Sequence, residues 1–257
     1  MILRPAHLEA SPPAAPTIPA WNAILRSQQP PREDCWLITQ PDHAALAGDV
    51  AANLSLPEVT AEVVRAIALH DEGWAACDQR ALHAAEAPGA SLPRSFVAMP
   101  VAEFVAAWSA SIDRAESVAP IGGLMVSEHF CWLADEHLSA GGDAPAEAVR
   151  LRTFLENEHK RRIRLRERER RPPAEVEKLL QALQFCDLVS LYLCCGAAEN
   201  VEFPQRLAGS RPIRLRREHE ACIFEPTPFR NSFDLAVAAR RGGTAEPHST
   251  TFPFFLW

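Results

Sequence analysis

The chain has 257 residues, of which 47% are hydrophobic, and its formal net charge is −7. This length and hydrophobic content suffice for one substantial domain with a small appendage, and they argue against disorder along most of the chain. The acidic balance argues against a protein that coats nucleic acid or anionic membranes, and no run of 18 apolar residues predicts a membrane span.

Residues 1–33 are predicted to form a proline-rich N-terminal arm. Proline, alanine and serine dominate 8–33, a composition typical of an extended segment, although Trp21, Ile24 and Leu25 have the spacing of a short anchoring helix. We therefore place the start of the main domain after this arm.

The segment 34–200 is predicted to be a helical domain. It opens with the apolar run Cys35–Thr39, which is either a strand or the lead-in to the first core helix. From about residue 40 to 198 the apolar residues recur with mostly helical periodicity, interrupted at prolines and glycines.

Beyond the helical domain, 201–257 is predicted to be a small β-rich subdomain. The segment 212–216 alternates apolar and polar residues, which is typical of a half-buried strand. Short runs at 221–224, 233–238 and 251–257, separated by prolines and glycines, extend this prediction. The expected fold class is therefore mainly α, with a small C-terminal antiparallel β-sheet.

The first core helix places a histidine on its apolar face. It begins at Pro41, a residue suited to the first helical position. Its inward face starts with His43 and continues through Ala47, Val50 and Leu54. The ring of His43 is therefore expected to point into the core.

Two further helices place carboxylates and a second histidine on apolar faces. One is predicted to start at a capping box of Ser55 and Glu58, and its apolar face ends at His70, with Asp71 next in the chain. The other follows a proline pair and carries Asp187 in the middle of the most hydrophobic helix of the chain. We expect all of these polar groups to be buried.

A buried carboxylate such as Asp187 needs a partner. An ionised carboxylate among apolar residues costs several kcal/mol unless it is paired, hydrogen-bonded or bound to a metal. No lysine or arginine lies between Lys178 and Arg206, so a local ion pair is excluded. For one residue alone, a salt bridge to a distant arginine or a metal-free bond to histidine is the simpler explanation. Two histidines and two aspartates aimed inward together favour a divalent metal site.

His129 lies on the apolar face of another predicted helix, with Ile121 and Met125. Three explanations stay open for this ring. The ring is a further metal ligand, or it contacts the substrate from just outside the metal ligands, or it is a core histidine hydrogen-bonded to a backbone carbonyl.

The arginine-rich run 159–171 suggests either a nucleic-acid surface or a long solvated helix. The glutamates interleaved with its arginines favour the solvated helix, and nucleic acid is not expected as a partner. A few of these arginines could still reach a phosphorylated substrate.

The order of the four polar residues resembles a known pattern. His43, then His70-Asp71, then Asp187 is similar to the H…HD…D order of the HD-domain superfamily of metal-dependent phosphohydrolases. The surrounding segments also resemble a bacterial family of uncharacterised HD-like proteins; these segments are 38–48, 69–74 and 185–191.

That resemblance extends over roughly residues 34–257. It implies an HD-domain-like helical bundle in which His43, His70, Asp71 and Asp187 bind the metal. Two departures are evident: Asp71 and Asp187 are farther apart than in compact members of the superfamily, and only His129 could serve a second metal. Binuclear chemistry, including that of an HD-like oxygenase, is therefore not expected.

The resemblance implies hydrolysis of a phosphoester or nucleotide by metal-activated water. Two imidazoles and two carboxylates suit Mn, Fe, Ni, Zn or Mg, and such an ion lowers the pKa of bound water. Glu72 and Asp42, each beside a ligand, are the candidate catalytic proton-transfer residues, with Glu72 preferred. The alternative is a non-catalytic metal-binding scaffold or a sensor of small molecules.

The seven cysteines indicate a reducing compartment. None lies in a CxxC pair, and Cys131, Cys186 and Cys194 fall inside apolar helical patterns where a free thiol acts as a small hydrophobe. The first residues lack the pattern of a secretory signal. We therefore expect a cytoplasmic protein.

Overall fold

The structure, a computed structural model, describes residues 1–7, 16–29, 35–85, 91–207, 209, 211–218, 221–241 and 249–257. Residues 8–15 and 30–33 of the predicted arm lie outside these residues. The helices are α1 (Ala20–Ser27), α2 (Gln40–Ala52), α3 (Ala61–Ala68), α4 (Ala75–Ala85), α5 (Val101–Val118), α6 (Pro120–Ala140), α7 (Pro145–Arg168) and α8 (Pro173–Cys195), with two short 3-10 turns, η1 (Glu72–Trp74) and η2 (Phe96–Ala98). The strands are β1 (Ile2–Pro5), β2 (Ile18–Pro19), β3 (Cys35–Ile38), β4 (Val201–Phe203), β5 (Ile213–Glu218), β6 (Ala221–Glu225), β7 (Phe233–Arg241) and β8 (Ser249–Leu256).

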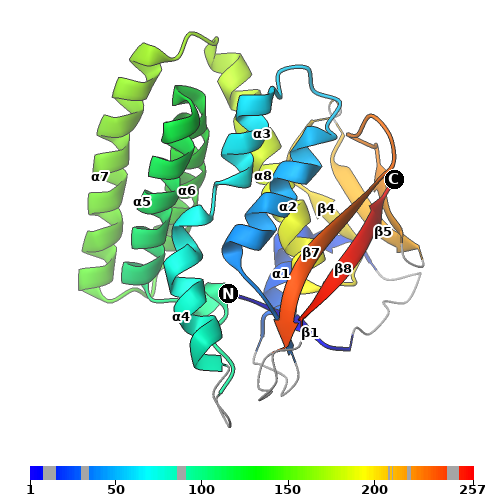
Figure 1. The fold of residues 1–257 in the computed structure, drawn as a ribbon. Coiled ribbons are helices and arrows are strands. Elements are labelled where there is room, and N and C mark those ends of the chain that lie inside the picture. The colour runs from blue at the N-terminus through cyan, green and yellow to red at the C-terminus, as the bar shows by residue number, and fades with distance from the viewer. Residues whose placement is uncertain are drawn as a thin grey trace.

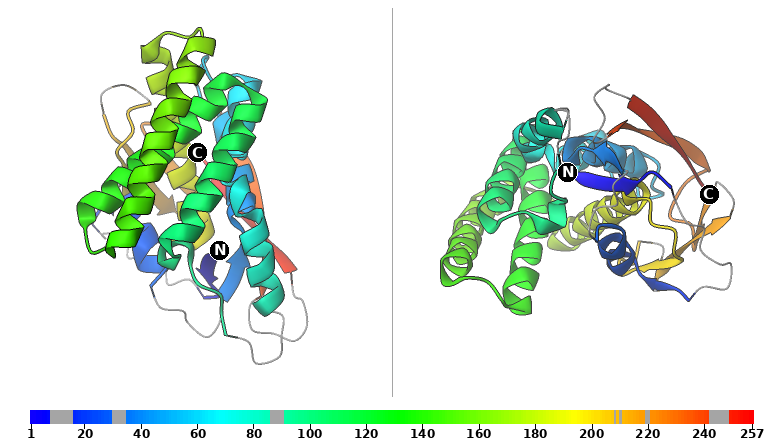
Figure 2. Two further views of the ribbon diagram at one scale, coloured as in Figure 1. Left: turned by 90° about the vertical axis from the view of Figure 1, so that its left-hand side faces the viewer. Right: turned by 90° about the horizontal axis from the view of Figure 1, so that it is seen from below.

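The helices and the sheet occupy opposite sides of the molecule. Helices α5, α6 and α7 form the outer helical layer, α2, α3 and α8 lie in the middle, and the sheet covers the far side (Figure 1). Seen from below, the sheet curves around α1, α2 and α8 (Figure 2). Helix α8 contacts α1, α2, α6 and β1, so it is the central element of the core.

The sheet differs from the predicted one. Within the described residues it has eight strands in the order β1-β3-β7-β8-β6-β5-β4-β2, and the pairs β2–β4 and β6–β8 are parallel. The expectation of a mainly α fold, an HD-like helical bundle with a small C-terminal antiparallel sheet, is therefore wrong. The strands expected in the C-terminal region are present, but they join strands from the first 38 residues.

The missed strands share a physical reason. β1 has four residues and β2 only two, and both lie in the proline-bearing N-terminal segment, too short to show alternation. Their conformation comes from pairing with β3 and with β4. The segments 1–33, 34–200 and 201–257 consequently all contribute strands to one sheet.

Helix starts follow local capping where tertiary contacts allow it. Helix α2 begins as expected, with Thr39 accepting a hydrogen bond from the backbone of Asp42 and proline in the first turn. The capping box expected at Ser55 does not form, because the Ser55 backbone N–H donates to Pro228 and Leu54 bridges Phe229. Helix α3 therefore starts only at Ala61.

Helix α8 has the length and mean hydropathy of a membrane span, and it is the one such helix among the described residues. However, 72% of its apolar window is buried inside the fold, as in the core helix of a soluble protein. The ring of Phe185 meets those of Phe203, Phe224 and Phe229 at centroid distances of 5.1, 6.2 and 6.3 Å. This aromatic cluster fixes α8 against the sheet and leaves its other face to the helices.

The arginine-rich run lies mostly on α7, as a long helix. Arg161 pairs with Asp113 and Glu116 of α5, and Arg162 pairs with Glu128 of α6 at 2.7 Å. These arginines therefore bind the neighbouring helices.

Candidate functional site

Five titratable side chains meet in the interior, where α2, α6, α8 and the turn after α3 come together. His43 comes from α2, His70 and Asp71 from the turn between α3 and η1, His129 from α6 and Asp187 from α8. All five are buried, with at most 9% of each residue exposed. The structure thus brings together the four predicted metal ligands and His129.

Contacts among the four predicted ligands are direct. His43 Nε2 lies 2.9 Å from Asp71 Oδ2. His70 Nε2 lies 3.2 Å from Asp187 Oδ1 and 3.9 Å from Asp71 Oδ2. The donor atoms of His43, His70 and Asp71 all lie within 4.8 Å of one another, a spacing that a single ion could bridge. We call these four residues the histidine–aspartate cluster.

The outer ring nitrogens of both histidines are held by hydrogen bonds. The Ser190 hydroxyl donates to the Asp187 carbonyl at 2.9 Å, so its oxygen accepts a bond of 3.0 Å from His43 Nδ1. His70 Nδ1 donates to the Ile67 carbonyl at 2.7 Å. In its neutral form, each ring therefore carries its proton on Nδ1 and turns an Nε2 lone pair towards the centre, the arrangement that metal-binding histidines adopt.

Asp71 is also oriented from outside. The indole N–H of Trp74 donates to its Oδ1 at 3.1 Å, which leaves Oδ2 facing the histidines. Trp74 is almost fully buried, so this bond is shielded from water.

The inner atoms of the cluster are all hydrogen-bond acceptors. Each Nε2 lone pair faces a carboxylate oxygen at about 3 Å, and two acceptors repel unless a positive charge lies between them. Among the described residues, no lysine or arginine forms an ion pair with the cluster. Protons on the rings or a shared cation must therefore supply that charge.

The pKa values of His70 and Asp187 also indicate that the cluster favours a positive charge. Burial opposes a charge on His70, but its hydrogen bond to Asp187 and the nearby Asp71 outweigh burial and raise its pKa to about 9. Burial likewise disfavours the Asp187 carboxylate, yet the contact with His70 lowers the pKa of Asp187 to about 2. Burial lowers the pKa of His129 to about 4, so this ring is neutral at pH 7.

We expect the metal-free protein to lose stability as pH rises from 6.5 to about 9. The pKa of His70 rises from 6.5 to about 9 on folding, so its contribution is complete below pH 6.5 and is lost as pH passes through 9. Asp187, whose pKa falls from 3.8 to about 2, contributes above pH 3.8 and loses that contribution towards pH 2. Melting temperatures measured across this pH range in excess chelator test both effects. In the control variant His70→Gln, the melting temperature should no longer fall between pH 6.5 and 9. A melting temperature that stays constant from pH 6.5 to 9 would contradict the assignment.

The cluster offers the donor atoms that divalent metals prefer, and the neighbouring His129 ring has a nitrogen without a hydrogen-bond partner among the described residues. Two imidazole nitrogens and two carboxylates form a mixed set that suits transition metals and magnesium. The Nδ1 atom of His129 has no hydrogen-bond partner among the described residues, and its Nε2 lies 3.6 Å from Asp187 Oδ2, too far for a normal hydrogen bond. The side chains of Asp71 and Asp187 are 12% and 11% exposed, so both carboxylates keep some contact with solvent.

The two candidate proton-transfer residues lie outside the cluster. Asp42 accepts a hydrogen bond from the Thr39 hydroxyl at the start of α2. Glu72 follows Asp71 at the start of η1, is half-buried and lines a cavity of about 430 Å³. Glu72 is thus the better placed of the two to meet a ligand.

The hydrogen bonds by which Ser190 and Trp74 orient the cluster were not predicted. Each lies three residues after a predicted ligand, Ser190 after Asp187 on α8 and Trp74 after Asp71 through η1. That spacing on a helical face was the available signal, since residues three apart are neighbours.

The chain was compared with known proteins. Neither a search of curated proteins nor a search of solved structures finds a match. A family model matches residues 25–241, a range that includes the whole histidine–aspartate cluster and His129. On this match, the chain belongs to the family described as "Protein of unknown function (DUF3891)".

Proposed function

We propose that this chain is a metal-dependent phosphohydrolase that acts on a phosphoester or nucleotide. The observation that carries the proposal is the cluster of inward-facing acceptors, which a divalent cation would satisfy. The similarity of the same residues to the H…HD…D order of metal-dependent phosphohydrolases supports it. A bound Mn, Fe, Ni, Zn or Mg ion would polarise a phosphoryl group and lower the pKa of water.

The chain's own residues would hold and orient that ion. Nε2 of His43 and of His70 would bind it together with carboxylate oxygens of Asp71 and Asp187. Ser190 and the Ile67 carbonyl keep both rings in the required tautomer, which also raises the basicity of the binding nitrogens.

Glu72 is the residue proposed to accept a proton during hydrolysis. Glu72 lines the cavity beside the cluster, and among the described residues its carboxylate has no ion-pair partner that would hold it elsewhere. Asp42, by contrast, is engaged by Thr39. The neutral ring of His129 would contact substrate from the α6 side.

A second candidate is a metal-binding scaffold or small-molecule sensor without turnover. The limited exposure of Asp71 and Asp187 favours it, because nearly buried carboxylates are more accessible to a small ion than to a phosphoester. The two candidates share the metal and differ only in catalysis.

The cytoplasm is the proposed location. All seven cysteines are free and all but Cys77 are buried, as expected for a protein kept in a reducing compartment.

Reloading the chelated protein with single metals tests the proposal. Phosphate release from phosphomonoesters and nucleotides is expected with at least one of the five ions. Glu72→Gln is expected to lower kcat at least tenfold while metal content stays unchanged, as for loss of a proton-transfer group.

Two outcomes separate the candidates. Stoichiometric metal without turnover on any substrate would favour the scaffold, and the failure of every ion to bind would refute both. Glu177→Gln, an exposed substitution on α8, is the matched control that should change neither quantity.

A further inference from the structure

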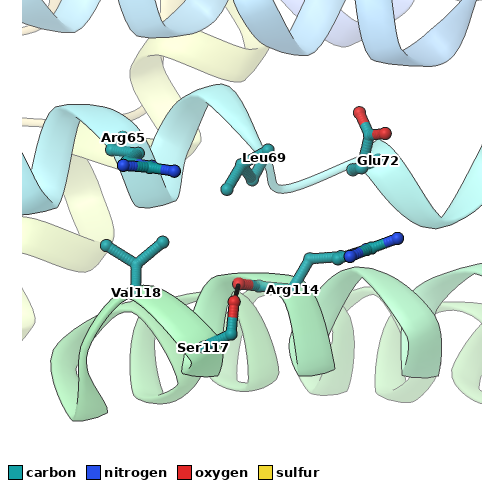
Figure 3. A pocket seen from close by; sticks show the side chains of 6 residues that line it. All are labelled: Arg65, Leu69, Glu72, Arg114, Ser117 and Val118. Atoms are coloured by element: carbon teal, nitrogen blue, oxygen red, sulfur yellow. Dashed lines mark hydrogen bonds between the residues drawn. The ribbon is translucent and has the colours of Figure 1, made fainter.

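A cavity next to the histidine–aspartate cluster has the side chains of an anion site. It measures about 430 Å³ and is lined by Arg65, Leu69, Glu72, Arg114, Ser117 and Val118. Figure 3 shows the two arginines entering the gap from opposite sides, Arg65 from α3 and Arg114 from α5. A volume of this size accommodates a small organic ligand.

Both arginines are available to a ligand. Neither Arg65 nor Arg114 forms an ion pair or a side-chain hydrogen bond within the part of the chain that the structure describes. This contrasts with the neighbouring hollow of about 470 Å³, where Arg161 and Arg168 already pair with Glu116. Within the described residues, both guanidinium groups of the cavity between α3 and α5 are therefore free to bind a ligand.

The other lining residues define the kind of anion. The Ser117 hydroxyl donates to the Arg114 carbonyl at 2.6 Å, so the arginines are the donors that an anion would meet. Two arginines and one glutamate leave a net charge of +1 on the lining. Leu69 and Val118 add an apolar wall, which suits the carbon skeleton of an organic phosphate more than an inorganic ion.

The cavity shares a wall with the cluster. Leu69 and Glu72 line it, while His70 and Asp71, the two residues between them, turn their side chains inward to the cluster. A ligand held by the arginines therefore lies against the segment that carries two of the proposed metal ligands.

We infer that this cavity binds the phosphate group of an organic phosphate through Arg65 and Arg114. The inference rests on the proposed function for the identity of the substrate, but the binding itself requires no turnover. Guanidinium groups recognise phosphate through charge-assisted, often bidentate, hydrogen bonds, and Arg65 and Arg114 offer such donors from facing helices.

Calorimetric titration with phenyl phosphate and with inorganic phosphate tests the inference. Arg65→Gln and Arg114→Gln are each expected to weaken binding of phenyl phosphate about tenfold, and the double variant about a hundredfold. Phenyl phosphate should bind more tightly than inorganic phosphate because of the apolar wall. Arg80→Gln, an exposed arginine of α4, is the control and should leave the affinity unchanged.

Repeating the titration after chelation distinguishes binding that depends on the arginines from binding that depends on the metal. Arginine-dependent binding that persists without metal supports the cavity, whereas binding that vanishes with the metal and ignores both arginines overturns it. Where turnover is found, the arginine variants should raise KM and leave kcat near its original value. Absence of turnover together with arginine-dependent binding would refute the hydrolase and leave the anion site standing.

Discussion

Asp187→Ala is expected to lose the proposed metal and yet remain folded. The carboxylate contacts His70 at 3.2 Å, and its removal takes away one of four proposed donors. Loss of a donor of this kind typically lowers metal affinity by orders of magnitude, so the purified variant should contain less than about a tenth of the metal of the original protein.

The same variant is expected to lose less stability than a protein in which a buried ion pair is broken. Breaking a buried ion pair costs about 3–5 kcal/mol when the remaining charge cannot neutralise. His70 can release its proton, because its raised pKa depends on Asp187. We therefore expect a loss of only about 1–3 kcal/mol in the free energy of unfolding of the metal-free protein, the cost of an unsatisfied buried polar group.

Elemental analysis and denaturant unfolding check these expectations. Glu177→Ala, on the same helix but exposed, is the matched control and should retain both metal and stability. Undiminished metal in Asp187→Ala would remove Asp187 from the site.

Gly73→Ala is expected to be the most destabilising single-methyl change near the site. A Cβ atom at Gly73 would lie 2.0 Å from the Ala107 carbonyl oxygen and 2.6 Å from the Ser111 backbone nitrogen, both in α5. Backbone atoms of a packed helix cannot move aside as a flexible side chain can, so η1 must separate from α5. We expect a loss of about 3 kcal/mol or more in the free energy of unfolding.

This displacement should also reach the cluster. Asp71 and Trp74 flank Gly73, and the Trp74–Asp71 hydrogen bond of 3.1 Å would be disturbed with them. Metal affinity is therefore expected to fall at least tenfold. Ala76→Ser, an exposed change three residues later, is the control, and denaturant unfolding with metal titration is the measurement. Wild-type stability in Gly73→Ala would show that α5 and η1 are not in close contact.

Much of the helical organisation was predictable because it is determined locally. Pro41 and Pro173 lie in the first turns of α2 and α8, where proline costs no hydrogen bond. The start of α3 was not predictable, since the Ser55 backbone is used by Pro228, a residue distant in the sequence.

The sheet was only partly predictable for the same reason. Alternation is visible in β5 and β7, which are long enough to show a period of two. The two residues of β2 contain no period, and the parallel pairing of β6 with β8 depends on a crossover that local patterns do not encode. Strand existence was therefore easier to predict than strand partners.

The cluster itself could be predicted because each polar residue interrupts an apolar face. His43, His70 and Asp187 are surrounded by buried hydrophobic residues, which makes them visible in the sequence. The cavity arginines Arg65 and Arg114 are exposed, and exposed arginines are ordinary in any helix, so no pattern distinguished them.

The pairing of distant segments has a consequence for how the protein is made. On a ribosome, β1 and β3 can pair early, but β2 must wait for β4, since Ile18 pairs with Val201. His70 likewise precedes its partner Asp187 by 117 positions. Until α8 emerges, the nascent chain holds His43, His70 and Asp71 but lacks Asp187, and long-range contacts such as His70–Asp187 form slowly. The proposed metal site is therefore complete only once α8 has been made and has packed against α2.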